Sequence, residues 1–367
     1  MITPLGTMKN RIQENVSLAP LTTFKIGGVA RFFATARSVE EVYEALAFAK
    51  ERDLPVFVLG GGSNVLIADD GFAGLTLRVD MTHVVFEERE GKMFVTAGAG
   101  VSWDDFVAQV VERGYAGLEC LSGIPGTVGG AVVANLGAYG AECSDTLVEA
   151  RVIDLQEISS DLKIFKNADC DFSYHDSFFG KNLDRYIIIE AIFAFEHVDA
   201  AQPAYRDSRF NLADLVAAKG RQPTLSEVRD AVIKVRGEKG VLSTSYKSAG
   251  SFFHMPFVSA AEYEHIRAVA EELDAEKEQR LRPWAWEQAD GSYKVAPGFL
   301  LEYTPFQKGY RTGAVGISPK HTLSVITSEG ARARDVAALA QAMHDAVQNI
   351  FSISLEREVK YIGAVEK

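Results

Sequence analysis

The stretch Val56–Ile67, with the sequence VFVLGGGSNVLI, constrains this chain more than any other segment. Four apolar residues, Val56–Leu59, predict a buried strand, and Gly60, Gly61 and Gly62 follow it at once. Because glycine has no Cβ, such a turn exposes successive backbone N–H groups, which can form a concave anion site. Ser63 and Asn64 add short side-chain donors, so the segment predicts a pyrophosphate-binding turn. On the glycines alone, an ordinary turn between two strands is the better interpretation.

Two familiar phosphate motifs do not fit this turn. No Gly-Lys-Ser/Thr follows it, as a P-loop would require, and no helix opens directly behind it, as a Rossmann dinucleotide site would require.

Composition restricts the protein class. The chain has 367 residues, of which 47% are apolar, enough for two or three domains with sizeable cores. A formal charge of −12 argues against nucleic acid or a membrane surface as partners. The cysteines Cys120, Cys143 and Cys170 are odd in number and lack CxxC spacing, which favours reduced thiols. With neither a signal peptide nor a membrane span in the sequence, we expect a cytoplasmic protein. We also expect it to be a monomer.

The pattern along the chain predicts a mixed, largely antiparallel α+β protein. Ser38 and Glu41 cap a helix that ends near Arg52 and completes a β–α–β unit with the Val56–Leu59 strand. A second glycine-rich segment, Leu121–Gly140, holds too many glycines for a helix interior. Two such loops imply a backbone wrapped around an extended ligand. Further predicted elements are a short extended segment Thr22–Ile26, strands 75–79, 84–87, 93–97, 148–155, 186–195, 323–327 and 352–362, and helices that start at Ser102, Thr224 and Ser259 or span 336–347.

Six motifs in order then resemble one known family. They are GGGSNVLI at 60–67, GIPGTVGGA at 123–131, NLGAYG at 135–140, YHDSFF at 174–179, AGSFF at 249–253 and LEREV at 355–359. Together they resemble the UDP-N-acetylenolpyruvoylglucosamine reductases, also called UDP-N-acetylmuramate dehydrogenases. The resemblance runs from about Thr22 to Gly363, and residues 287–302 resemble the longer of the family's two forms.

The resemblance implies a vanillyl-alcohol-oxidase-type FAD-binding fold in two lobes with a separate α+β substrate-binding domain. The expected boundaries are 20–80 and 81–200 for the lobes, 205–350 for the substrate-binding domain, and 351–367 for a strand returning to the active site. The implied reaction uses NADPH to reduce non-covalent FAD. The reduced flavin then passes a hydride to UDP-N-acetylglucosamine enolpyruvate, giving UDP-N-acetylmuramate for peptidoglycan.

The resemblance also implies catalytic roles. Hydride addition leaves negative charge beside the substrate carboxylate, so the site needs a proton donor and enolate stabilisation. By resemblance Ser251 is the proton donor and Glu358 the catalytic glutamate. From the residues alone, Ser251 would be a turn-capping serine, and Glu358 would lie on a solvated strand face.

Position 175 departs from the family pattern. The family has arginine within Tyr-Arg-Asp-Ser, whereas this chain has His175 within Tyr174–Ser177. Because histidine is charged only at lower pH, we expect His175 to take the arginine's place and to stabilise the enolate less well, or only when protonated. The alternative is a structural hydrogen-bonding residue. A literal Tyr-Arg-Asp-Ser at Tyr205–Ser208 falls instead where the family has a substrate-binding tyrosine.

The remaining site residues follow from the same resemblance. Lys239 and Lys294 would bring positive charge to the substrate diphosphate, although each could be an ordinary surface lysine. Trp286 replaces a substrate-clamping tyrosine, Met255 replaces an asparagine, and His321 is a further candidate ligand contact. No metal spacing is present. The residues expected to bind FAD are Gly60, Gly61, Gly62, Ser63, Asn64, Ser122, Gly123, Ile124, Pro125, Gly126, Thr127, Gly129 and Gly130.

Two rival functions stay open at this point. One is an oxidase of the same flavin-binding fold that acts on a small alcohol or lactone. The other is a catalytically impaired paralogue that binds flavin or a UDP-sugar, an idea motivated by the changes at positions 175, 255 and 286.

Overall fold

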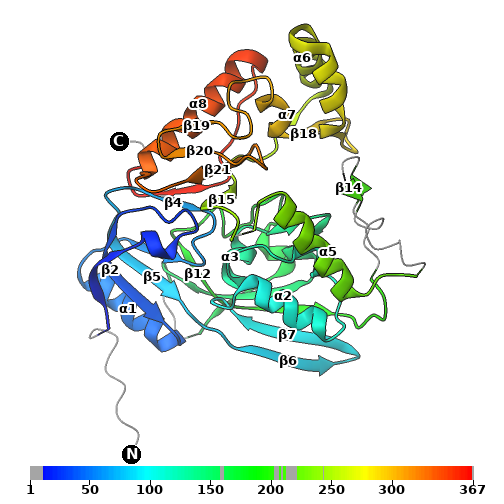
Figure 1. Ribbon diagram of the computed structural model, residues 1–367. Helices are drawn as coiled ribbons and strands as arrows, with labels where there is room; N and C mark the ends of the chain where they lie inside the picture. The colour runs from blue at the N-terminus through cyan, green and yellow to red at the C-terminus, as the bar shows by residue number, and fades with distance from the viewer. Residues whose placement is uncertain are drawn as a thin grey trace, which may run out of the picture. The chain divides into compact units, whose positions relative to one another are not determined.

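The structure is a computed structural model that describes residues 11–157, 161–201, 206–207, 210–211, 221–242 and 244–365 (Figure 1). The chain forms two compact units. Unit 1 contains residues up to Leu21 together with Val29–Gly62 and Gly71–Arg236, and unit 2 contains Thr22–Gly28, Ser63–Asp70 and the chain from Gly237 onward. The division after Arg236 differs from the start of the predicted substrate-binding domain at residue 205, because most of helix α5 (Leu225–Glu238) belongs to unit 1. The limits of the functional domains stay predictions.

The first sheet of unit 1 carries the glycine turn. Its strands follow the order β1-β2-β5-β3, and both β2 and β3 run parallel to β5. Helix α1 packs on β2 and β5 (Figure 1). At its start the Ser38 hydroxyl accepts a hydrogen bond from the Glu41 N–H, as predicted. The β–α–β unit is therefore confirmed. The bounds are Gln13–Ser17 for β1, Val29–Ala36 for β2, Val39–Glu51 for α1, Val56–Leu59 for β3 and Phe72–Val79 for β5.

The second sheet of unit 1 is antiparallel throughout, in the order β11-β10-β12-β7-β6. Helix α3 packs on β12 and β7, and α2 packs on α3. The bounds are Val84–Arg89 for β6, Lys92–Gly98 for β7, Trp103–Glu112 for α2, Val128–Val133 for α3, Leu147–Asp154 for β10, Lys163–Lys166 for β11, Tyr186–Phe195 for β12 and Leu225–Glu238 for α5; the short pairs are Gly137–Ala138 for β8 with Ala141–Glu142 for β9, and Arg206–Asp207 for β13 with Phe210–Asn211 for β14.

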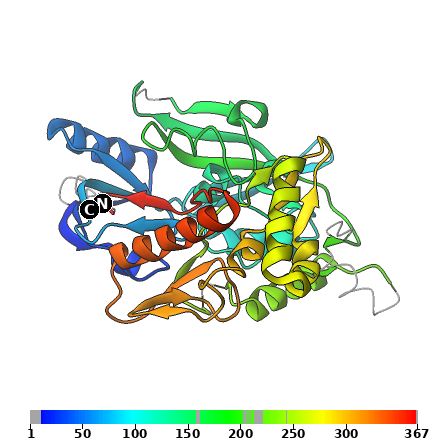
Figure 2. The same ribbon diagram turned by 90° about the horizontal axis from the view of Figure 1, so that it is seen from above.

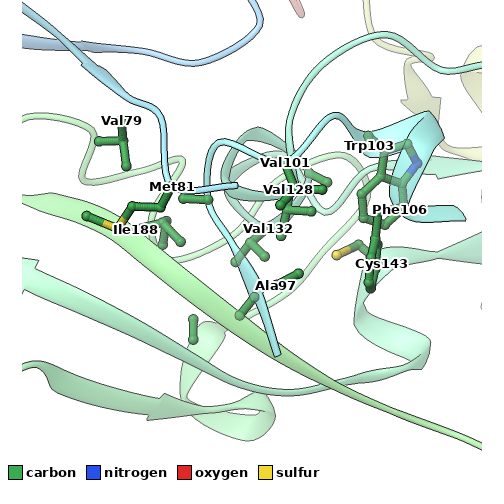
Figure 3. Close-up of a cluster of buried hydrophobic side chains, with 14 of the residues drawn as sticks. Val79, Met81, Ala97, Val101, Trp103, Phe106, Val128, Val132, Cys143 and Ile188 are labelled. Atoms are coloured by element: carbon green, nitrogen blue, oxygen red, sulfur yellow. The ribbon is translucent and has the colours of Figure 1, made fainter. Parts of the chain in front are cut away.

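The core of unit 1 fixes the start of α2 and the whole of α3. Trp103 and Phe106 on α2 gather with Val128 and Val132 on α3, and all four are fully buried (Figure 3). The Trp103 indole N–H donates to the Leu121 carbonyl at 3.2 Å, which ties the core to the second glycine-rich segment. All three cysteines are free and buried.

Unit 2 contains the remaining sheets, with strand orders β15-β21-β20-β19, β16-β18-β17 and β22-β4. Helix α8 packs on β20 and β21 (Figure 2). Helix α6 is interrupted at Asp274, whose φ of −167° and ψ of 94° are not helical. The bounds are Val65–Ile67 for β4, Ser248–Ser251 for β15, Phe257–Val258 for β16, Ala260–Leu281 for α6, Ala285–Glu287 for β17, Tyr293–Val295 for β18, Pro297–Leu301 for α7, Arg311–Thr312 for β19, Val315–Ile317 for β20, Ser324–Thr327 for β21, Ala333–Phe351 for α8 and Lys360–Ile362 for β22.

Several element predictions were wrong in detail. Thr22–Ile26 forms a turn rather than an extended strand, and only Lys360–Ile362 of the predicted strand 352–362 pairs in a regular ladder. Ser102 precedes α2 but makes no side-chain capping bond. The glycine-rich segment does contain a helix, α3, because Thr127 caps it and Gly129 allows close packing: a Cβ there would stand 2.9 Å from the Ala99 Cβ.

Within the described ranges, no helix has the length and apolar character that crossing a membrane requires. The same ranges contain no group of three or more His, Cys, Asp or Glu side chains arranged to hold a metal ion.

Candidate active site

The two glycine-rich segments of unit 1, predicted separately, meet backbone to backbone. A Cβ on Gly61 would stand 2.7 Å from the Gly126 Cα, and one on Gly60 would stand 3.0 Å from the Thr127 Oγ1. Gly62 has a φ of +63°, which favours glycine. In the part of the chain that the structure describes, the N–H groups of Gly61 and Gly126 donate no hydrogen bond. This pair of turns, which we call the glycine loops (Gly60–Gly62 and Gly123–Thr127), can offer donors to an anion.

Charged side chains from two helices hold the second glycine loop at Gly123. The Gly123 N–H donates to the Asp104 carboxylate at 2.6 Å, and Arg229 on α5 donates to both Asp104 oxygens at 2.6 and 3.0 Å. Burial alone would raise the pKa of Asp104, but the hydrogen bonds from Arg229 and Gly123 outweigh it and the pKa lies below its ordinary value. Asp104 is therefore ionised at neutral pH, and its carboxylate anchors the loop at Gly123.

Arg236, near the end of α5, binds the carbonyl group of the same residue, Gly123. Its Nε–H donates to the Gly123 carbonyl at 3.2 Å. Burial lowers the pKa of Arg236, against the opposing effect of the nearby Tyr139 and Asp104. Sequence reasoning missed Asp104, Arg229 and Arg236. The seven-residue spacing of the two arginines places them on one helix face, but their shared target becomes visible only in the fold.

Ser122 lies beside this loop but faces inward. Its side chain is fully buried, and its hydroxyl donates to the Glu119 carbonyl at 2.7 Å. The structure therefore gives Ser122 a local structural bond, and its predicted contact with FAD stays a prediction.

His175 lies at the tip of a tight turn tied to the far end of helix α3. Ser173 and Asp176 exchange both backbone hydrogen bonds around Tyr174 and His175, and His175 has a φ of +52°. The Asn135 side-chain amide donates to the Ser173 carbonyl at 3.0 Å. The NLGAYG and YHDS motifs thus meet in space, just beyond the C-terminal end of helix α3, where the Ser177 hydroxyl donates to the Val133 carbonyl at 2.7 Å.

The catalytic residues expected in unit 2 also come together. The Glu358 N–H donates to the Phe252 carbonyl at 3.0 Å, directly beside Ser251, and the Asn64 amide donates to the Glu358 carbonyl at 3.3 Å. Lys360 N–H donates to the Asn64 carbonyl at 3.1 Å, and β22 runs parallel to β4. Three segments that are remote in the sequence therefore converge around Ser251 and Glu358.

Glu358 does not behave as a residue on a solvated strand face. Glu356 and Arg357 are exposed, whereas Glu358 is partly buried. Burial raises the pKa of Glu358 to about 7, although the nearby Lys360 opposes the shift. A carboxyl group with this pKa holds a proton for a large part of the time near neutral pH, which suits acid chemistry.

The predicted substrate residues occupy several places in unit 2. Trp286 on β17 lies opposite Lys294 on β18, and the Lys294 Nζ lies 5.6 Å from the Phe257 ring centroid. His321 lies just before β21, and its carbonyl accepts the Ser324 N–H at 3.1 Å. Lys239 is exposed just after α5. Tyr205 lies outside the described residues, and the ligand roles of the other four stay predictions.

Two family models match separate parts of the chain. The FAD binding domain model matches residues 30–157, and the C-terminal domain model of UDP-N-acetylenolpyruvoylglucosamine reductase matches residues 242–362. The first match covers the glycine loops, and the second covers Ser251, Glu358, Trp286, Lys294 and His321.

Whole-chain comparisons agree with the domain matches. The UDP-N-acetylenolpyruvoylglucosamine reductase of Thermobifida fusca is 37% identical over 97% of this chain and 99% of its own length. That of Pseudomonas aeruginosa is 35% identical over 96% of this chain and 99% of its own length. The crystal structure of the reductase from Thermus caldophilus matches with a TM-score of 0.65 at 23% identity, covering 96% of this chain and 100% of that chain.

A solvent-stable cholesterol oxidase also shares the fold, with a TM-score of 0.50 at 11% identity over 97% of this chain and 88% of that chain. Together with the two domain matches, this likeness confirms the predicted α+β class with a vanillyl-alcohol-oxidase-type FAD-binding fold. The chain belongs to the UDP-N-acetylenolpyruvoylglucosamine reductase family.

Proposed function

We propose that the protein reduces UDP-N-acetylglucosamine enolpyruvate to UDP-N-acetylmuramate, with electrons from NADPH and with non-covalently bound FAD. Family membership supports an oxidoreductase of peptidoglycan synthesis. The observation that carries the finer proposal is the convergence at Glu358, whose N–H binds the carbonyl next to Ser251 and whose pKa is raised to about 7 by burial.

The glycine loops fit the cofactor. A pyrophosphate is bound by hydrogen-bond donors, and a glycine backbone can approach it closely because it has no Cβ. Among the described residues, the N–H groups of Gly61 and Gly126 donate no hydrogen bond within the protein and can serve as such donors. Gly60–Asn64 would hold the pyrophosphate, and Ser122–Gly130 would follow the rest of the cofactor. When bound, FAD supplies hydride transfer from NADPH to the enolpyruvyl double bond.

The acid–base residues would then complete the addition. As one carbon gains hydride, negative charge develops on its neighbour and in the adjoining carboxylate. Ser251 would give its hydroxyl proton to that neighbouring carbon. Glu358, protonated for part of the time near pH 7, would donate a hydrogen bond to the developing enolate. His175 would add positive charge only in its protonated form.

Binding of the UDP-sugar would depend on positive and aromatic side chains of unit 2. Lys239 and Lys294 would offer positive charge to the diphosphate. Trp286 would stack on the uracil or ribose, and His321 would add a polar contact. Tyr205, expected to contact substrate as well, completes the predicted set.

The test is NADPH oxidation by the purified yellow protein with and without UDP-N-acetylglucosamine enolpyruvate. We expect oxidation that depends on the substrate and that falls by about 100-fold or more in Ser251→Ala, the effect expected from loss of a proton donor. Oxygen consumption with an alcohol and without the UDP-sugar would favour the oxidase instead. A protein that keeps its flavin but shows no substrate-dependent oxidation at any pH would favour the impaired paralogue.

A further inference from the structure

Strand β15 contains an irregularity that decides which way Ser251 faces. Ser248 pairs with Ile326 and Ser251 pairs with Ser324. Between these two pairs, β15 advances by three residues and β21 by two. The additional residue is a β-bulge, and Gly250 within it has a φ of +78°. Because side chains alternate along a strand, one additional residue turns Ser251 to the opposite face. The bulge therefore places Ser251 on the same face as Ser324.

The hydrogen bonds around this pair bring the two side chains close. The Phe252 N–H donates to the Leu323 carbonyl at 2.9 Å, so the neighbours of Ser251 and Ser324 make the ladder bond. Ser251 and Ser324 thus form a non-hydrogen-bonded antiparallel pair, in which opposite Cβ atoms lie about 5 Å apart. At that separation, rotation about the two Cα–Cβ bonds can bring the hydroxyls into hydrogen-bonding contact.

Ser324 carries a hydroxyl that the fold leaves unused. Its side chain has 0% relative exposure, and its Oγ has no hydrogen-bond partner among the described residues. A buried hydroxyl without a hydrogen-bond partner destabilises a protein, so a functional reason for keeping one here is worth seeking. The side chain across the strand pair from it is Ser251.

We propose that Ser324 is a positioning residue for proton transfer, donating a hydrogen bond to the Ser251 Oγ as that oxygen loses its proton. This inference rests on the proposed function, in which Ser251 protonates the substrate. The O–H bond of Ser251 breaks, a C–H bond forms on the substrate carbon, and the electron pair stays on the Ser251 Oγ. The Ser324 hydroxyl stabilises that negative charge until solvent returns a proton after product release.

The experiment compares Ser324→Ala with Thr322→Val in the full-length, flavin-loaded protein. Thr322 is a matched control because it is 4% exposed and its Oγ1 also has no partner among the described residues, yet it does not pair with Ser251. Stopped-flow absorbance follows flavin reduction by NADPH and, separately, flavin reoxidation by UDP-N-acetylglucosamine enolpyruvate. Melting temperatures of both variants report on folding.

We expect Ser324→Ala to slow reoxidation by about tenfold or more, below the effect of removing a direct oxyanion donor, while flavin reduction stays unchanged. Its solvent deuterium isotope effect on reoxidation should increase, because proton transfer becomes more rate-limiting. The melting temperature should stay equal or rise, and Thr322→Val should match the wild type. Wild-type reoxidation rates in Ser324→Ala, or equal slowing in both variants, would overturn the inference. A wild-type protein that is never reoxidised by the substrate would instead contradict the proposed function.

Discussion

The glycine loops of unit 1 and the Ser251–Glu358 region of unit 2 differ in how their charged and polar side chains are stabilised. Around the loops, the charged side chains are paired: Asp104 accepts hydrogen bonds from Gly123 and Arg229, and its pKa is lowered. Around Ser251, polar groups are held at a cost: burial raises the pKa of Glu358, and the Ser324 hydroxyl has no partner among the described residues. Hydrogen bonds therefore anchor the second glycine loop, whereas the Ser251–Glu358 region keeps energetically unfavourable groups, as the proposed acid–base role would require.

The largest expected effect comes from Gly61→Ala, which attacks the rigid region directly. The new Cβ would stand 2.7 Å from the Gly126 Cα, and two backbones must separate to admit it. Overpacking of this kind costs roughly 3 kcal/mol, which is about 100-fold in affinity. We expect the purified variant to lose its flavin absorbance and its activity. Gly237→Ala is the control, since a Cβ there would stand 3.5 Å from its nearest neighbour, the Leu242 Cδ1. If Gly61→Ala retains flavin at the wild-type level, the two loops can move apart without losing the cofactor.

Glu358→Gln tests the second region through activity. The amide keeps the shape of the side chain but cannot act as an acid, so we expect substrate-dependent turnover to fall by about 100-fold. Flavin content should stay at the wild-type level, because the glycine loops are untouched. Glu356→Gln, at an exposed position of the same motif, is the control. Equal turnover in the wild type and Glu358→Gln would remove the glutamate from the mechanism.

The same variant should be more stable than the wild type at alkaline pH. A carboxyl whose pKa rises from 4.5 to about 7 on folding keeps its proton in the folded state while the unfolded chain ionises. Its contribution to stability is therefore full below pH 4.5 and is lost as the pH rises through 7. The shift corresponds to at most about 3 kcal/mol, and partial exposure reduces the expected gain to about 1–2 kcal/mol at pH 8. Urea unfolding at pH 4 and pH 8 measures it, and a gain that is the same at both pH values would refute the assignment to ionisation.

Asp104→Asn should have a moderate effect on the loops. The change removes the charge that Arg229 binds and replaces one acceptor by a donor, so we expect a loss of about 1–2 kcal/mol in unfolding free energy and a severalfold weaker hold on flavin. Because the pKa of Asp104 is lowered in the fold, the stability difference should be present at neutral pH and shrink as the pH falls. Asp105→Asn, on the exposed face of the same helix, should behave as the wild type in flavin titration and urea unfolding.

Sequence reasoning succeeded where structure depends on neighbouring residues. The strand Val56–Leu59, its glycine turn and the helix capped by Ser38 follow from local patterns, and the structure contains all three. It failed at α3, because counting glycines ignored the Thr127 cap and the close contact of Gly129 with Ala99. Local composition cannot show that a glycine is needed for packing.

The site was predicted unevenly for the same reason. The pattern LEREV gives no sign that Glu358 is buried, since its environment comes from Phe252 and Asn64 on remote segments. Family resemblance identified Glu358 as a candidate, and the fold shows that burial raises its pKa. Ser324 and Arg236 carried no motif, and each acquires its significance only from the residue that the fold places beside it.

His175→Arg should have the smallest effect. It tests whether the acid–base region depends on a histidine for positive charge, whereas the glycine loops depend on arginines. His175 lies on a turn whose Ser173 carbonyl accepts a hydrogen bond from Asn135, and its side chain is half-buried, so melting temperatures must accompany the rate comparison. A histidine ordinarily loses its charge near pH 6.5, whereas arginine keeps it. We expect turnover to rise a fewfold above pH 7 and to depend less on pH than in the wild type. Because Glu358 titrates near pH 7 in the same window, the comparison uses both proteins across pH 5.5–8.5, with His265→Arg on the exposed face of α6 as the control. If His175→Arg has the wild-type rate and profile, the histidine is a structural residue of the turn, and the enolate is stabilised by another cation.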